Sequence, residues 1–207
     1  MKNKHENNNK KNKKKIMSKK NITILAIIGL LLIIVFWIGG TYNSLVKKNE
    51  SCNSQWSKVE SQYQRRMDLI PNLVSVVKGY AKHESETLLK VVQARNQAMN
   101  TPNDEKSIGK YQTAQNNLTS ALRGLNIIIE RYPDLKANQN FLELQSQLEG
   151  TENRIAVERQ RYSDMVQKYN QKIKSFPTNI IAGMFNFSQK EYYQADKGSD
   201  KAPKVEF

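Results

Sequence analysis

The sequence predicts an all-α protein in which one N-terminal transmembrane helix precedes an up-and-down four-helix bundle of long helices. Three observations predict this class: residues 22–38 form one uncharged apolar run, apolar residues recur at three- and four-residue steps later in the chain, and no alternating β-branched run is found. We therefore expect four regions: a disordered Lys/Asn-rich arm at 1–20, a transmembrane helix at 21–40, a helical bundle at 41–187 and a flexible tail at 188–207.

The N-terminal arm carries much of the positive charge of the chain. Residues 1–20 contain nine lysines and one glutamate, within a formal net charge of +14 for all 207 residues. So polar a segment cannot bury a core, and we expect it to be disordered near an anionic leaflet that attracts its lysines. After residue 40 the two signs are interspersed, so nucleic-acid binding is not indicated.

The apolar run has the length of a membrane span. With its uncharged neighbours it reaches about 20 residues, which cross ~30 Å of hydrocarbon. A buried core helix would need apolar partners on every face, and a cleaved signal peptide would be shorter and end in small residues, so an uncleaved anchor is favoured. The expected anchor residues are Ile22, Leu25, Ile28, Leu32, Val35, Trp37 and Ile38.

The lysines also predict an orientation. Nine precede the span, whereas only Lys47 and Lys48 follow it closely. The positive-inside rule therefore predicts a cytoplasmic N-terminus and a bundle outside the cytoplasmic membrane.

Breaker residues divide the body into helices. Pro71 would remove a hydrogen bond and clash with the preceding turn, so we expect separate helices at 42–69 and 72–100 rather than one kinked rod. Thr101-Pro102 is expected to begin the next helix, with threonine as the cap and proline at the first helical position. An apolar stripe then predicts an amphipathic helix that lasts until Pro133.

The last long helix shows a seven-residue repeat. Its predicted seam consists of Phe141, Leu148, Ile155, Tyr162, Tyr169 and Phe176. A second line of positions runs along the same helix beside this seam, and it is polar in its middle, at Glu152 and Arg159 among others. These side chains either face solvent or meet partners on facing helices, such as Arg65, Arg66 or Arg123. After Lys174, Pro177 is suited to open a short helix.

Catalytic motifs are missing from the sequence. His83-Glu84 would need a second histidine at 87, where threonine stands, and neither a nucleophile elbow nor a phosphate loop is found. Cys52 is the only cysteine and lacks the processing site of a lipid anchor, so we expect it to be a small helix residue. The sequence therefore predicts a non-enzymatic protein without cofactor or metal.

Several blocks of the chain resemble the LemA family: YNSLVKKNE at 42–50, RRMDLIPNLVSVVKGYAKHE at 65–84, and ERYPDLKANQNFLELQSQLEGTENRIAVERQRYSDMVQKYNQKIKSFPTNIIA at 130–182 with the following FNF. The resemblance covers nearly everything from residue 22 and implies a single-span protein with a soluble four-helix up-and-down bundle. It also implies a short N-terminus on the outer side of the membrane. The lysines of this chain indicate a cytoplasmic N-terminus instead, and we keep that prediction. Asn186 stands where relatives often have glycine.

We expect a protein of the bacterial cell envelope that lies in the lipid bilayer and presents its bundle for protein–protein interaction, assembly or signalling. Binding of anionic cell-wall polymers or lipid headgroups is the alternative, a membrane-bound hydrolase the least favoured one, and a homo-oligomer is compatible with each. Two surfaces are candidates for partner contacts. They are an aromatic patch at Phe176, Ile180, Met184, Phe185 and Phe187, and a polar stripe at Arg65, Arg66, Asp68, Glu152 and Arg159. Core packing and bundle salt bridges are the simpler explanations.

Overall fold

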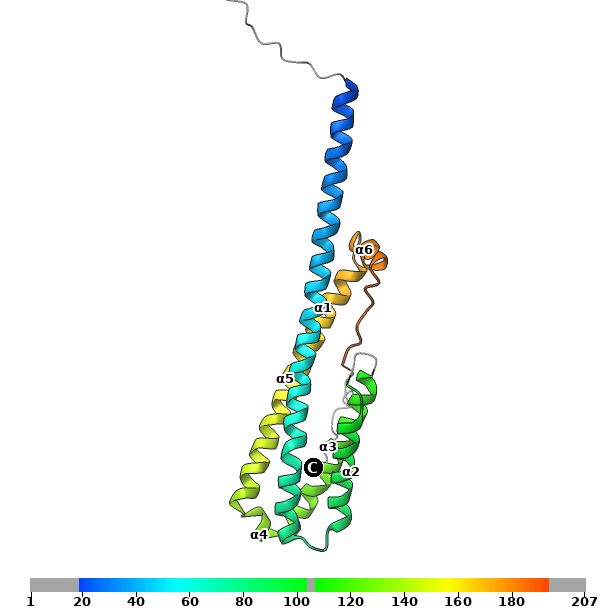
Figure 1. Cartoon of the computed structure of the whole chain (residues 1–207). Helices are drawn as coiled ribbons and strands as arrows, with labels where there is room; N and C mark the ends of the chain where they lie inside the picture. The colour runs from blue at the N-terminus through cyan, green and yellow to red at the C-terminus, as the bar shows by residue number, and fades with distance from the viewer. Residues whose placement is uncertain (1–18, 104–106, 194–207) are drawn as a thin grey trace, which may run out of the picture. The chain divides into compact units, whose positions relative to one another are not determined.

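The computed structural model describes residues 19–103 and 107–193, and every regular element within these ranges is a helix (Figure 1). The all-α class is therefore confirmed. The chain divides into two compact units between Asn43 and Ser44. Most of the expected disordered arm and the end of the expected tail lie outside the described residues. The helices are α1 (Lys19–Tyr80), α2 (Ser85–Asn100), α3 (Ile108–Arg131), α4 (Pro133–Lys136), α5 (Gln139–Lys174) and α6 (Thr178–Met184).

The part of α1 in the first unit carries the expected membrane anchor. An 18-residue window of this helix has a mean hydropathy of 3.0, and none of the window is buried within the protein. Large apolar side chains such as Ile33 and Phe36 are mostly exposed. Transfer of such exposed apolar side chains from water to lipid is favourable. The helix is therefore long and apolar enough to cross a membrane at the place that the sequence predicts.

The predicted helix break at Pro71 is wrong, because α1 continues through Pro71 to Tyr80. Proline has no N–H, so the carbonyl of Met67, four residues earlier, loses its partner within the helix. Arg95 of α2 takes over that role, since its Nε donates to the carbonyl oxygen of Met67 at 2.7 Å. A side chain from a neighbouring helix thus compensates for the bond that proline removes.

The predicted start of the third helix is also wrong. α2 ends at Asn100 as expected, but α3 begins at Ile108 rather than at Pro102. The hydroxyl of Thr101 donates back to the carbonyl of Gln97 at 2.7 Å, so it does not cap a following helix. Trp56 of α1 donates from Nε1 to the carbonyl oxygen of Asn103 at 2.8 Å, and Asn103 itself lies outside any helix.

The later helices follow the sequence pattern more closely. α3 buries most of the predicted apolar stripe, and α5 ends at Lys174 as expected. The seven-residue seam of α5 is confirmed except at Phe176, which is 81% exposed. The reason is that Ser175 is the extended C-cap of α5, so Phe176 lies beyond the helical repeat. Pro177 precedes the short helix α6, as predicted.

Two hydrophobic clusters form the core of the second unit. The first joins the end of α1, after Met67, to α2, α3, α4 and the start of α5. The second joins the earlier part of α1, from Leu45 to Tyr63, to the later part of α5 and to α6. Gln55 contacts Glu158 and Arg66 contacts Glu152, so α5 runs antiparallel to this part of α1.

The expected flexible tail at 188–207 needs a correction at its beginning. Lys190 and Tyr193 are buried, and residues 188–193 lie against α1 and α5. The physical reason is that polar side chains of both helices bind the backbone and the tyrosine of this segment. Residues 194–207 lie outside the part that the structure describes.

Candidate functional site

A buried arginine lies at the centre of the second unit. Arg66 of α1 is 2% exposed, and its Nη1 donates to Glu152 of α5 at 2.7 Å and to Thr119 of α3 at 3.0 Å. Its Nη2 donates to the side-chain oxygen of Gln115 at 2.5 Å. A buried guanidinium group needs this set of acceptors, because an unpaired buried charge is strongly destabilising. The arginine therefore ties α1, α3 and α5 together.

The polar stripe does not form one surface. Glu152 forms an ion pair with the buried Arg66, although its own side chain is 49% exposed. The expectation that it meets a partner on a facing helix and the expectation that it faces solvent therefore each hold in part. Arg159 instead lies over the ring of Tyr193, 3.7 Å from its centroid. Arg65 and Asp68 are exposed on another side of α1. The stripe thus divides into an internal network, a contact with the tail and an outer groove.

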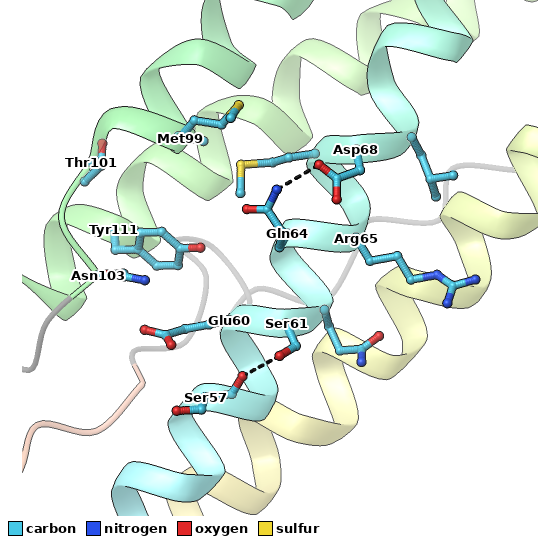
Figure 2. A pocket seen from close by; sticks show the side chains of 14 residues that line it. Ser57, Glu60, Ser61, Gln64, Arg65, Asp68, Met99, Thr101, Asn103 and Tyr111 are labelled. Carbon is cyan, nitrogen blue, oxygen red and sulfur yellow. Dashed lines mark hydrogen bonds between the residues drawn. The ribbon is translucent and has the colours of Figure 1, made fainter.

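The outer groove, which we call the α1–α2 groove, has a volume of about 880 Å³ (Figure 2). Successive turns of α1 supply most of its polar side chains, while the end of α2, the connection after it and the start of α3 supply the rest. Its lining residues include Ser57, Glu60, Ser61, Gln64, Arg65, Asp68, Met99, Thr101, Asn103 and Tyr111.

The groove offers donors and acceptors of mixed charge. Gln64 donates to Asp68 at 2.7 Å, and Ser61 donates to the carbonyl of Ser57 at 2.8 Å (Figure 2). Burial raises the pKa of Glu60. The surface can therefore bind hydrogen-bonding groups of either charge.

The tail segment at 188–193 lies against α1 and α5. The side chain of Asn170 binds the backbone of Lys190 twice: it accepts from the N–H at 3.0 Å and donates to the carbonyl at 2.9 Å. Lys190 donates from Nζ to Asn53 at 2.8 Å. The hydroxyl groups of Tyr63 and Tyr193 share a hydrogen bond of 2.5 Å. These contacts hold an extended segment against the helices.

Sequence reasoning missed these tail contacts. Asn170 and Lys190 are ordinary polar residues in a linear reading, and their pairing needs the antiparallel approach of α1 and α5. The one local signal is the Tyr192-Tyr193 pair, since two aromatic residues are unusual in a solvated tail. Tyr193 is 9% exposed, as expected for a residue that packs against a core.

An aromatic cluster in the core contacts the α1–α2 groove through Tyr111 and the tail through Tyr63. The ring of Trp56 lies 5.1 Å from that of Tyr162 and 6.1 Å from that of Tyr111, and Tyr111 meets Tyr63 edge to face at 5.5 Å. Burial raises the pKa of Tyr111 to about 12 and raises the pKa of Tyr63 further. Burial also raises the pKa of the Cys52 thiol, so this cysteine is a packed core residue rather than a nucleophile.

The aromatic patch follows α5. Phe176, Ile180, Met184 and Phe185 are exposed, whereas Phe187 packs partly against the core. Asn186 has φ 57°, in the left-handed region that favours glycine or asparagine. Two backbone bonds close this turn, from Phe187 N to Ala182 O at 2.9 Å and from Asn186 N to Gly183 O at 3.4 Å. Asparagine thus fulfils the conformational role of the glycine that relatives often have here.

No group of three or more histidine, cysteine, aspartate or glutamate side chains that could hold a metal is found in residues 19–103 and 107–193. His83 is exposed in the connection between α1 and α2. The described residues therefore give a ligand set no support.

Comparisons with known proteins agree with the sequence blocks. The model of the LemA family matches residues 55–207. The protein LemA of Metamycoplasma hominis is 26% identical over 158 residues, which cover 76% of this chain and 71% of that protein. The magnetosome protein MamQ 1 of Paramagnetospirillum magneticum is 26% identical over 181 residues, or 77% of this chain and 66% of that protein. MamQ of Magnetospirillum gryphiswaldense is 25% identical over the same share. The chain thus spans about two thirds of the length of these relatives.

Proposed function

Because the chain belongs to the LemA family, we propose that it is a non-enzymatic, single-pass membrane protein of the cell envelope whose helical bundle docks a protein partner in the α1–α2 groove. One observation carries this proposal. The outward face of α1 between Ser57 and Asp68 lines a groove of about 880 Å³, while Val59 and Tyr63 on its other face are buried in the core.

The chemistry of the groove favours a polypeptide. Small-molecule sites are predominantly apolar with a few polar groups, whereas this groove presents many hydroxyl, amide and charged side chains. Arg65 and Asp68 are exposed charges that can select a partner of complementary pattern. Met99, also exposed, supplies an adaptable apolar contact.

The finer architecture belongs to the same proposal. The second unit forms an up-and-down four-helix bundle from the later part of α1 with α2, α3 and α5. The antiparallel pairing of α1 with α5 and the short connections between successive helices support this arrangement. The lysines of residues 1–20 support a cytoplasmic N-terminus and a bundle on the outer side of the membrane.

Site-specific crosslinking tests the docking groove. A photoreactive amino acid replaces Ser61 in the full chain in its native membrane. The matched control replaces Ser120 of α3, since both are exposed serines whose hydroxyl donates to the carbonyl four residues earlier. We expect one discrete adduct from position 61 that disappears in R65E, and none from position 120. No adduct at 61, or the same products from both positions, would refute the groove as the docking site.

Cysteine labelling tests the orientation separately. Cys52 is fully buried and reacts poorly, so a Ser120→Cys variant, exposed on α3 outside the groove, provides the accessible thiol. We expect a membrane-impermeant maleimide to label this variant in intact cells and to leave the parent chain unlabelled. Labelling that requires permeabilised cells would contradict the proposed sidedness.

A further inference from the structure

The short helix α6, the last helix that the structure describes, has an unusually apolar outer surface. Phe176 is 81% exposed, Ile180 54%, Met184 66% and Phe185 47%. We call these four residues the α6 patch. Thr178, Ile181 and Ala182 on the inner side of α6 are buried, so the helix is held in place by its other face. Large exposed apolar side chains on α6 and on the residues that flank it are typical of a surface that contacts a partner or a membrane.

The covalent chain limits how far the α6 patch lies from the bilayer. Within the second unit α5 runs antiparallel to α1, so the last turn of α5 lies towards the beginning of that unit. Leu45, Ile173 and Ala182 accordingly share one core cluster. Leu45 follows Ile38, the end of the apolar run, by only seven residues of helix, or about 10 Å at 1.5 Å per residue. This limit comes from chain length and holds for any orientation of the two units.

The charges around the patch fit an anionic surface. Lys168, Lys172 and Lys174 precede it on α5, and no aspartate or glutamate occurs from residue 165 to residue 190. Exposed aromatic and aliphatic side chains beside lysines are the composition of helices that lie in a lipid interface, with apolar groups among the upper acyl chains and ammonium groups at the phosphates.

We propose that the α6 patch inserts into the headgroup and upper acyl region of the bilayer that the N-terminal segment spans, with Lys172 and Lys174 at anionic headgroups. The bundle then has a second, reversible contact with the membrane besides its covalent anchor. This contact is separate from the α1–α2 groove and does not rest on the docking function.

Fluorescence in proteoliposomes tests the insertion. The full chain carries an environment-sensitive fluorophore on Met184→Cys, with the buried Cys52 left in place. The control is Ile127→Cys on α3, because Ile127 is 67% exposed and Met184 is 66% exposed. The vesicles contain phosphatidylcholine and phosphatidylglycerol with bromine on the acyl chains, which quenches only fluorophores that reach these chains.

We expect blue-shifted emission at position 184 and quenching at least about twofold stronger than at position 127, as for a side chain several ångströms inside the interface. K172Q together with K174Q, or removal of phosphatidylglycerol, should weaken this quenching. Equal quenching at both positions would overturn the insertion. A blue shift without bromine quenching would also overturn it, since a second copy of the chain would then cover the patch. Quenching that is independent of phosphatidylglycerol would overturn the role of the lysines.

Discussion

Replacing Arg95 with methionine removes the donor that compensates for Pro71. In the native protein the Nε of Arg95 lies 2.7 Å from the carbonyl oxygen of Met67, which proline deprives of its helical partner. Methionine keeps much of the unbranched side chain but cannot donate. The variant therefore leaves a partly buried carbonyl without a hydrogen bond in the middle of α1.

The structure allows an estimate of the loss. A hydrogen bond to a charged group contributes about 1.5–3 kcal/mol, and partial exposure of Arg95 lets water replace some of it, so we expect R95M to lower the free energy of unfolding by about 1–2 kcal/mol. In a P71A background the alanine N–H can bind the carbonyl of Met67 again. The same R95M change should then cost only a few tenths of a kcal/mol, giving a coupling energy of about 1 kcal/mol.

A double-mutant cycle measures this coupling. Urea unfolding of the full chain in detergent micelles is followed by the fluorescence of Trp56, which is buried in the second unit. All four proteins carry W37F, because Trp37 is the other of the two tryptophans. Equal slopes of free energy against urea show that the transitions are comparable. A coupling energy below about 0.3 kcal/mol would refute the compensation of Pro71 by Arg95, because independent sites add within such limits.

Three further predictions concern the tail, the turn after α6 and the tyrosine cluster. N170A removes both hydrogen bonds to the backbone of Lys190, which together contribute about 2 kcal/mol. Trypsin should therefore cleave after Lys190 about 30-fold faster in this variant than in the parent chain. An unchanged cleavage rate would contradict the tail contacts. N186A should lower the free energy of unfolding by about 1 kcal/mol because alanine is strained at φ 57°, whereas N186G should be neutral or slightly stabilising in the same urea assay. The raised pKa of Tyr111, about 12, means that the unfolded chain loses this proton first, so its contribution to stability is complete below pH 10 and is lost as pH rises towards 12. Y111F should therefore show a shallower decline in stability between pH 9 and pH 11 than the parent chain.

Much of the fold could be predicted from local pattern. The apolar run, the stripe of α3 and the seam of α5 each depend on side chains a few residues apart, and the structure confirms these elements. Pro71 shows the limit of such reasoning. Its local penalty is real, but it is compensated by Arg95, which lies 24 positions later in the sequence, and no periodicity reveals that contact.

The candidate sites were less accessible to sequence reasoning for the same reason. Arg66 was one of three arginines considered as partners of Glu152, with exposure to solvent as the alternative, and the structure pairs Arg66 with a Glu152 that is still 49% exposed. Arg65 stands next to Arg66 in the sequence but is exposed on another side of the helix. The α6 patch was recognised by composition alone, whereas its exposure depends on where α5 ends. The α1–α2 groove and the tail contacts combine residues that are far apart in the sequence, and both follow from packing that composition does not encode.

The position of the tail contacts in the chain has a consequence for biosynthesis. Asn53 and Lys190 are 137 residues apart, and Tyr63 and Tyr193 are 130 apart. A ribosome adds the second residue of each pair long after the first, so these contacts can close only after the whole stretch between them has been made. Until then Tyr63 of α1 lacks its last neighbour, Tyr193, and this end of the core stays open.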